Sequence, residues 1–276
     1  MTSRTWFVTG ASAGIGRLVT EQLLASGHRV AATARSPLPD LAERYGDQLW
    51  TARLDVTDMN ALRAVVGRAF RDLGRVDVVF SNAGRGSVGA AEELTDAVID
   101  DQIALNLTAP IQLLRAVLPH FRAQGGGRFV QTSTMGAHIT TPGASTYHAT
   151  KWGVEGFLES VIPEVAPFGV GITMVEPGVV RTTFGANLSI AEPMPEYAGT
   201  VVGQLHRFLA STDSVTAGAP GDPVKVAAAI IASAATEPAP RRLVLGSDSH
   251  ESVHAALTAR LSEIDAAKDT AAAVDF

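Results

Sequence analysis

Short, nearly continuous apolar runs alternate with longer amphipathic stretches along most of the chain. Apolar runs that end in turn residues are typical of buried strands, and the stretches between them have the spacing of helices. Because strands covered on both faces read as near-continuous apolar runs, we predict an α/β fold, a doubly wound parallel seven-stranded sheet with helices on both faces. The predicted strands are a first one that begins by residue 5 and contains Trp6-Phe7-Val8, then Arg29–Ala34, Leu49–Leu54, Val76–Phe80, Gly127–Thr132, Val170–Val175 and Arg242–Leu245.

The chain is predicted to be one domain. No repeat and no shift in composition divides residues 1–276. The segment at about 183–221 is irregular and Pro-rich, then amphipathic, which predicts a lid over a bound substrate. The Ala-rich, polar tail after about 265 is expected to fray.

Composition excludes several classes of function. Hydrophobic residues make up 46% of the chain, and a net charge of −6 without any basic block argues against a nucleic-acid partner. Without cysteine there is no disulfide, no thiolate nucleophile and no Cys-ligated zinc, and we predict no metal site. The first strand begins too early for a signal peptide, and the longest apolar run, 226–235, is too short for a membrane span. We therefore expect a cytoplasmic protein without a membrane partner.

A glycine turn, Thr9–Gly16, follows the first strand directly and opens a predicted helix. Glycine at Gly10 permits a tight turn, at Gly14 an approach of backbone amides to an anion, and at Gly16 close packing of helix on strand. Because a helix N-terminus attracts anions, this arrangement predicts a Rossmann-like dinucleotide site, with Ser12 and Ile15 on the same turn.

The ends of the next strands suggest how a dinucleotide would lie. The second strand ends in Ala34 and Arg35, where an NAD site would want an acid, and the guanidinium suits a 2′-phosphate. We therefore predict NADP(H) as the preferred cofactor and NAD(H) as the second option, although Arg35 could instead be a solvated surface residue. Asp55 and Val56 follow the third strand, where Asp55 could accept from the adenine amino group. Asn82-Ala83-Gly84 lets a cofactor lie flat against the backbone, while Asn82 could equally be a structural tie between strands.

The predicted catalytic groups come later in the chain. Ser145 is a plausible N-cap, so Tyr147 and Lys151 fall one turn apart on one face of a helix. A nearby ammonium favours the phenolate, which predicts a lowered pKa for Tyr147. A hydroxyl from the end of the fifth strand would then hold a substrate oxygen beside the tyrosine. Within a helix at about 96–118, Pro110 removes the N–H that would bond the Asn106 carbonyl, which predicts a kink and a carbonyl free for water.

Taken together, these motifs resemble the short-chain dehydrogenase/reductase family, and the resemblance runs from about Thr5 to Gly246. It is carried by Thr9-Gly10-x-x-x-Gly14-x-Gly16, Asp55, Asn82-Ala83-Gly84, Asn106, Ser133-Thr134, Tyr147-x-x-x-Lys151 and Pro177-Gly178. The resemblance implies a homo-oligomer, a homodimer or homotetramer, that oxidises alcohols or reduces carbonyls with NAD(P)(H).

The resemblance also implies roles for single residues. Tyr147 is the general acid in reduction and the general base in oxidation, Lys151 binds the nicotinamide ribose and lowers the pKa of Tyr147, and Asn106 holds a water. The family usually has a serine 13 residues before the tyrosine; that position is Thr134 here, and Ser133 is the rival. The residues that resemble a clamp on the nicotinamide carboxamide are Pro177, Gly178, Val180 and Thr182.

The sequence thus predicts an NADP(H)-dependent oxidoreductase that acts on a moderately apolar carbonyl or alcohol. A regulator that binds NADP without catalysis is the alternative, although such proteins characteristically lose the tyrosine or the lysine. A sugar-nucleotide epimerase would have a longer chain and different glycine spacing, and an enoyl reductase a wider tyrosine–lysine spacing. The apolar residues proposed as pocket walls, which could instead be plain packing, are Phe184, Leu188, Ile190, Met194 and Tyr197.

Overall fold

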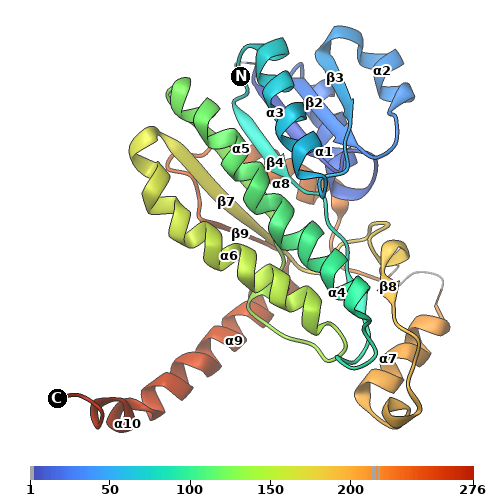
Figure 1. Cartoon of the computed structure of the whole chain (residues 1–276), viewed down its shortest axis with the longest axis vertical. Coiled ribbons are helices and arrows are strands. Elements are labelled where there is room, and N and C mark those ends of the chain that lie inside the picture. The colour runs from blue at the N-terminus through green and yellow to red at the C-terminus, as the bar shows by residue number, and fades with distance from the viewer. Residues whose placement is uncertain (1–2, 213–215, 217) are drawn as a thin grey trace.

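The computed structural model (Figure 1) describes residues 3–212, 216 and 218–276. At its centre lies a seven-stranded sheet in the order β3-β2-β1-β4-β6-β7-β9, and every neighbouring pair of strands is parallel. This confirms the predicted sheet, with strand ends that differ by one or two residues. The strands are β1 Thr5–Thr9, β2 Arg29–Ala34, β3 Leu49–Arg53, β4 Val78–Ser81, β6 Gly127–Thr132, β7 Val170–Pro177 and β9 Arg242–Leu245.

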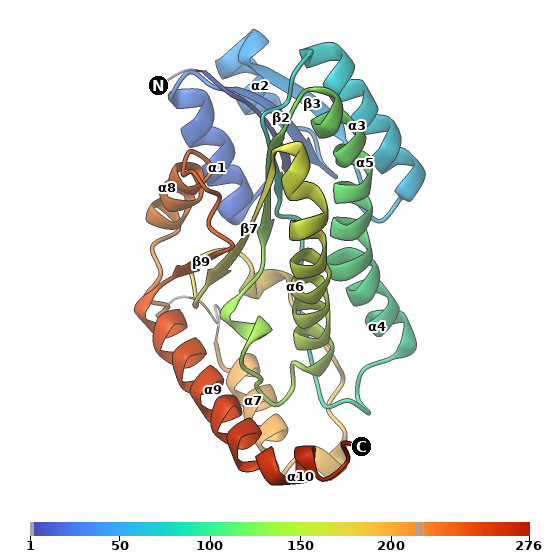
Figure 2. The same cartoon turned by 90° about the vertical axis from the view of Figure 1, so that its left-hand side faces the viewer.

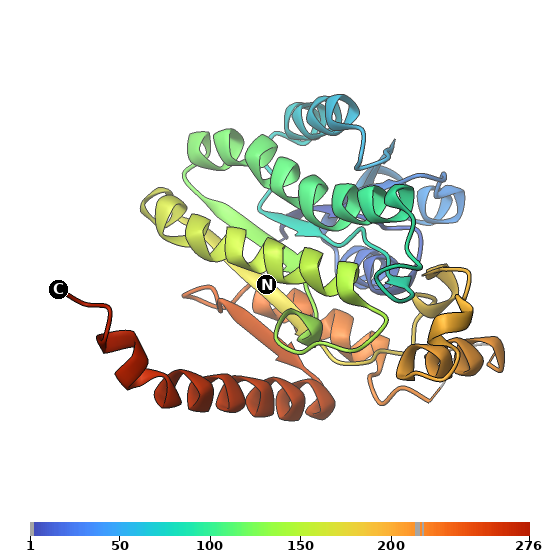
Figure 3. The same cartoon turned by 60° about the horizontal axis from the view of Figure 1, so that its bottom comes forward.

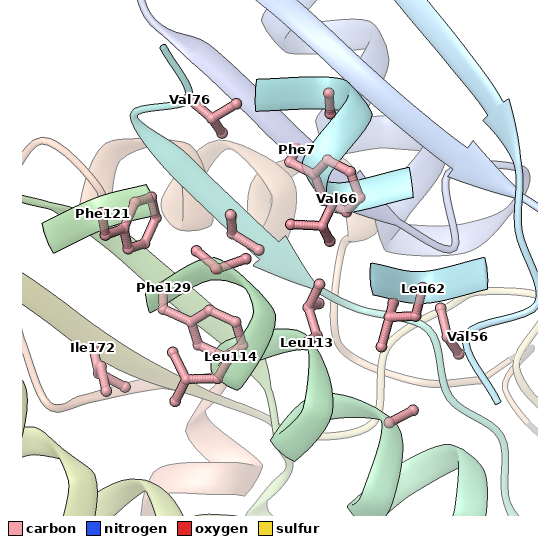
Figure 4. Close-up of a cluster of buried hydrophobic side chains, with 14 of the residues drawn as sticks. Phe7, Val56, Leu62, Val66, Val76, Leu113, Leu114, Phe121, Phe129 and Ile172 are labelled. Atoms are coloured by element: carbon pink, nitrogen blue, oxygen red, sulfur yellow. The ribbon is translucent and has the colours of Figure 1, made fainter. Parts of the chain in front are cut away.

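Successive side chains of a strand point to opposite faces of the sheet, so apolar strands present apolar side chains on both faces. Helices cover both of these faces (Figure 2). Phe7 of β1 packs into one apolar core with α3, α5 and α6, and Figure 4 shows it facing Val66. Its neighbours Trp6 and Val8 pack into a second core with α1 and α8. The helix bounds are α1 Gly14–Ala25, α2 Pro39–Tyr45, α3 Met59–Leu73, α5 Ala109–Ala123, α6 Ser145–Val165 and α8 Pro223–Ser233.

Two helix boundaries differ from the predictions. The helix expected at 96–118 is α4, Asp96–Ile103, then a π-helical turn at Ala104–Thr108, then α5. Pro110, which follows this turn, has no N–H to donate. The hydrogen bond here spans five residues instead of four, because the N–H of Ala109 donates to the carbonyl of Ala104. The predicted capping by Ser145 is wrong: Ala144 is the N-cap of α6, and Ser145 is already helical.

The predicted lid segment is tied to the body by backbone pairing at both ends. Its two-residue strand β8, Ser189–Ile190, pairs in parallel with β5, Ser87–Val88, and Val180 bridges to Gly221. Strands of two residues carry no hydrophobic period, so the sequence did not predict them. The segment also contains helix α7, Val201–Ala210. Residues 213–215 and 217 of the predicted lid lie outside the described residues.

The C-terminal region is helical. Helix α9, Ser247–Ala266, ends where the tail begins, and α10, Lys268–Ala272, follows it; fraying of this tail stays a prediction. Both helices project from the sheet (Figure 3), so Leu257, Leu261 and Ile264 are exposed. In the described part of the chain, no helix is long and apolar enough to cross a membrane.

Replacing Gly16 by alanine is expected to lower the free energy of unfolding by about 1–3 kcal/mol, because overpacking displaces the backbone. A Cβ there would lie 2.3 Å from the Gly10 carbonyl oxygen. The matched control is Gly156→Ala on α6, where an added Cβ meets nothing within 4 Å and should stabilise by about 0.5–1 kcal/mol. Urea denaturation of both variants measures the difference, and equal stabilities would contradict the expected clash.

Candidate active site

A cavity of about 760 Å³ opens at the carboxyl ends of the strands. It lies where the strand order reverses between β1 and β4, the place where ligands bind in sheets of this kind. Most predicted site residues line it, except Gly16 and Asn106, which lie behind its wall. The predicted residues in the lining are Gly10, Ser12, Gly14, Ile15, Arg35, Asp55, Val56, Asn82, Ala83, Gly84, Ser133, Thr134, Tyr147, Lys151, Pro177, Gly178, Val180 and Thr182.

The glycine turn forms one side of this cavity. Gly10 and Gly14 have φ angles of +68° and +54°, a left-handed backbone that favours glycine. Ala13, whose side chain cannot accept a hydrogen bond, is the N-cap of α1. The first N–H groups of α1 lack partners within the helix and carry the positive end of its dipole. The turn therefore fits the pyrophosphate of a dinucleotide.

Asn82 ties three strand ends together at the cavity wall. Its Nδ2 donates to the Thr9 carbonyl at 3.2 Å, and its Oδ1 accepts from the Thr132 hydroxyl at 3.2 Å. Its N–H donates to the Thr9 hydroxyl at 2.9 Å. The structural tie left open by the sequence is therefore present, and the same residue also lines the cavity.

Asn106 is 1% exposed and lies in the π-helical turn behind the cavity. Its Nδ2 donates to the Arg85 carbonyl at 2.8 Å, and its Oδ1 accepts from the Arg85 N–H at 3.2 Å. Both ends of the amide therefore hold the backbone just after Gly84. The side chain shapes the cavity wall from behind it.

Charged groups line the part of the cavity beyond β2 and β3. Arg35 is exposed at the rim. Asp55 accepts from the hydroxyl and the N–H of Thr57 at 2.7 and 2.9 Å, and these hydrogen bonds hold the pKa of its carboxyl below the usual value. Arg85 and Asp101 form an ion pair of 2.9 Å elsewhere in the lining. Sequence reasoning missed this pair, although Arg85 directly follows the Asn82-Ala83-Gly84 motif.

Tyr147 and Thr134 line the same cavity. Burial raises the pKa of the phenol to about 12, and a hydrogen bond with Thr134 opposes that shift. The lowered pKa expected from the sequence is therefore not found for the protein alone. The physical reason is the loss of water around a buried phenolate, which is the larger of the two effects.

Lys151 is buried one turn further along α6. Its Nζ donates to the carbonyl of Thr132 at 2.9 Å. Burial lowers the pKa of this ammonium to about 8, and the negative charge of Glu155 opposes the shift. An amine poised near neutrality beside a phenol is the kind of pair that handles protons in active sites.

The two hydroxyls at the end of β6 have different partners. The Ser133 hydroxyl donates to Glu155, whereas the Thr134 hydroxyl accepts from the N–H of Gly136 at 3.1 Å. Both residues line the cavity. The nearby His148 has a structural place, because its Nε2 accepts from the Thr141 N–H at 3.0 Å.

Of the predicted pocket walls, only Phe184 lines the main cavity among the described residues, with its ring centre 6.1 Å from that of Tyr147. Met194 and Tyr197 line a second cavity of about 340 Å³ beside α7. Leu188 packs against Gly86, and Ile190 is exposed.

Comparison with known proteins identifies the family. A family model described as short chain dehydrogenase matches residues 4–193. The chain belongs to the short-chain dehydrogenase family. Oxidoreductase BOA17 of Botryotinia fuckeliana (strain B05.10) is 34% identical over 259 residues, which cover 90% of this chain and 91% of that protein.

Solved structures agree with this assignment. A short-chain dehydrogenase from Streptomyces avermitilis has a TM-score of 0.90 and 38% identity, and the match covers 100% of both chains. An alcohol dehydrogenase from the archaeon Thermococcus sibiricus, complexed with 5-hydroxy-NADP, shares the fold with a TM-score of 0.71 at 24% identity, over 88% of this chain and 96% of that one.

As a short-chain dehydrogenase, the chain is an NAD(P)-dependent oxidoreductase of the CH–OH/C=O class. The catalytically silent regulator is not favoured, because the tyrosine, the lysine and a threonine hydroxyl lie together in one cavity.

The buried ammonium of this short-chain dehydrogenase should make stability depend on pH. Because the pKa of Lys151 is lowered from 10.5 to about 8, the unfolded chain binds more protons in that window, and stability should rise as pH rises through it. The shift corresponds to about 3 kcal/mol as an upper bound, and Lys151→Met should abolish this rise.

The measurement is denaturant unfolding between pH 7 and about 10. Above this range the raised pKa of Tyr147 lowers the free energy of unfolding as pH rises, which is opposite to the effect of Lys151. Lys225→Met, at an exposed lysine of α8, is the matched control and should keep the wild-type rise. A rise that persists in Lys151→Met would contradict the assignment to Lys151.

Proposed function

We propose that this enzyme is an NADP(H)-dependent oxidoreductase that transfers a hydride between the nicotinamide and a carbonyl/alcohol pair on a moderately apolar substrate, with Tyr147 as general acid and base. The observation that carries this proposal is one cavity with the glycine turn and Arg35 in one part of its lining and Tyr147, Lys151 and Thr134 in another. Its size, about 760 Å³, suits a dinucleotide and a small substrate together.

The proposed proton chemistry belongs to Tyr147 and Thr134. The bound nicotinamide supplies a hydride to the carbonyl carbon in reduction and accepts one from the alcohol carbon in oxidation. Tyr147 donates its phenolic proton to the substrate oxygen in reduction, and the phenolate takes the proton back in oxidation. Because Tyr147 and Thr134 line the same cavity, a substrate oxygen between their hydroxyls would accept from both. Thr134 is the proposed orienting hydroxyl because that of Ser133 is bonded to Glu155.

Lys151 is proposed to hold the cofactor and to stabilise the phenolate. An ammonium has three N–H donors, of which the Thr132 carbonyl takes one. We assign the others to the hydroxyls of the nicotinamide ribose. An ammonium also favours the negative phenolate that forms when Tyr147 gives up its proton. Asn106 supports the same region from behind by fixing the backbone of Arg85, and a water on its carbonyl remains a prediction.

The remaining contacts follow the lining of the cavity. Pro177, Gly178, Val180 and Thr182 are proposed to hold the nicotinamide carboxamide. The substrate side combines Phe184 with Met135 and Leu105, which favours apolar substituents on the carbonyl carbon. The segment 183–221 is proposed to cover this side as a lid.

NADP(H) is the proposed cofactor, with NAD(H) as the second option. Arg35 lies at the rim of the cavity, and the preceding residue, Ala34, offers no carboxylate to ribose hydroxyls. A relative that shares the fold was crystallised with an NADP derivative, which supports the same choice.

A homodimer or homotetramer is also proposed. The exposed apolar residues Leu257, Leu261 and Ile264 lie along one side of α9, as expected for a helix that packs against a partner subunit. The cytoplasmic location and the lack of membrane or nucleic-acid partners stay predictions from the sequence.

Tyr147→Phe should lower kcat for carbonyl reduction by about 10²–10⁴-fold, since the proton donor is lost, while NADPH binding is kept. Turnover is followed by NADPH absorbance with a panel of ketones and aldehydes, and binding by NADPH fluorescence. Tyr45→Phe on α2 is the control and should retain full activity. Retained turnover in Tyr147→Phe would refute the role of the phenol.

Arg35→Asp should weaken NADPH binding by about 10–100-fold, because a charge-assisted contact with the 2′-phosphate is lost, and should leave NADH binding unchanged or improved. The matched charge reversal is Arg44→Asp, at an exposed arginine of α2. Fluorescence titrations of both cofactors measure the change, and an unchanged NADPH affinity would overturn the assignment of Arg35.

A further inference from the structure

A cluster of charged side chains, three of them buried and Arg242 partly exposed, lies directly behind the proposed catalytic groups. Glu155, which is 4% exposed, follows Lys151 by one turn of α6. Beside it are His138, Glu176 of β7 and Arg242 of β9. The reaction as proposed above uses none of these four side chains.

Arg242 supplies the positive charge that this cluster needs. Its Nη2 lies 3.3 Å from Glu155 and 2.5 Å from Glu159, and its Nε lies 2.9 Å from Glu176. His138 Nε2 adds a contact of 3.1 Å to Glu176. Although a histidine and two carboxylates could hold a metal ion, the guanidinium already occupies the cation position between the carboxylates.

One oxygen of Glu155 reaches toward the active site. Its Oε1 accepts the hydrogen bond of the Ser133 hydroxyl, while its Oε2 faces Arg242 and His138. Ser133 is also held through its N–H, which donates to the Val175 carbonyl at 2.8 Å. The next residue is Thr134, which lines the same cavity as Tyr147. Glu155 therefore fixes the backbone that presents the substrate-orienting hydroxyl.

The same carboxylate acts on Lys151 through its charge. Burial disfavours the ammonium, and the negative charge of Glu155 raises the pKa of Lys151 against that effect. Arg242 is shared among three carboxylates, because it pairs with Glu176 and Glu159 as well as with Glu155.

We propose that Glu155 is a positioning residue with two separable effects: it holds the Ser133–Thr134 backbone in place through the Ser133 hydroxyl, and its carboxylate, one turn of α6 beyond Lys151, supports the ammonium of that lysine through its charge. This proposal rests on the proposed function, since it assigns Lys151 and Thr134 their roles there. It extends the active site into the interior, to groups that touch neither substrate nor cofactor.

The sign of the pH effect follows from the charges that face Glu155. These are Lys151 and Glu159 on its own helix, His138 after β6, Glu176 on β7 and Arg242 on β9. Without the carboxylate, less opposes the effect of burial on Lys151, and the amine loses its proton at a lower pH. NADPH binding and carbonyl reduction both need the ammonium. The pH above which each of them declines, called its alkaline limit here, should therefore move to lower values for both together.

Glu155→Gln tests this, because glutamine keeps the shape and can still accept from Ser133 while the charge is lost. We expect the alkaline limit of NADPH affinity, measured by fluorescence titration, and that of kcat/KM to fall by about one pH unit. Ser133→Ala removes the hydrogen bond and keeps the charge, so it should lower kcat without moving either limit. Glu159→Gln is the matched control, because Glu159 contacts Arg242 but is half exposed, and it should move neither limit.

Two further measurements, on Glu155→Asp and on the wild-type enzyme, can contradict the proposal. Glu155→Asp, which keeps the charge on a shorter side chain, should keep the wild-type limits with a lowered kcat, and it serves if Glu155→Gln does not fold. Unmoved limits in Glu155→Gln, or shifted limits in Glu155→Asp, overturn the proposal. If wild-type enzyme binds NADPH but reduces no carbonyl, the proposed function fails, while the binding arm still tests the effect of Glu155 on Lys151.

Discussion

The close contact between α1 and the ends of β1 and β4 is the constraint on which the rest of the structure depends. Gly16 lies so near the Gly10 carbonyl and Asn82 that any side chain would push the helix away from the sheet. With the helix seated there, its N-terminus faces the cavity, and Asn82 can bond Thr9 and Thr132. One missing Cβ therefore sets the position of the cofactor pocket relative to the strand that leads into Thr134.

Much of this arrangement could be predicted because local rules decide it. Buried parallel strands must be apolar on both faces, so the seven apolar runs correspond to the seven strands of the sheet. Residues four apart on a helix share a face, which brings Tyr147 and Lys151 into one cavity. The glycine turn is likewise a local pattern, since its strand, turn and helix are contiguous in the chain.

What the sequence did not reveal depends on contacts between distant residues. Glu155 and Ser133 are 22 positions apart, and their hydrogen bond exists only because α6 packs against β7, next to the end of β6. The pKa of Tyr147 was predicted in the wrong direction because the distance to Lys151 and the degree of burial are properties of the folded chain. Pro110 indicated an irregularity in the helix, but the residue spacing does not distinguish a kink from a π-helical turn.

The pairing of β5 with β8 and the bridge from Val180 to Gly221 have a consequence for how enzymes of this shape diversify. Both attachments are made by the backbone, so they do not depend on which side chains the intervening residues carry. Evolution can therefore exchange the residues between these two anchor points, and with them the surface that the proposed lid offers to a substrate, while the proposed proton-transfer groups stay where they are.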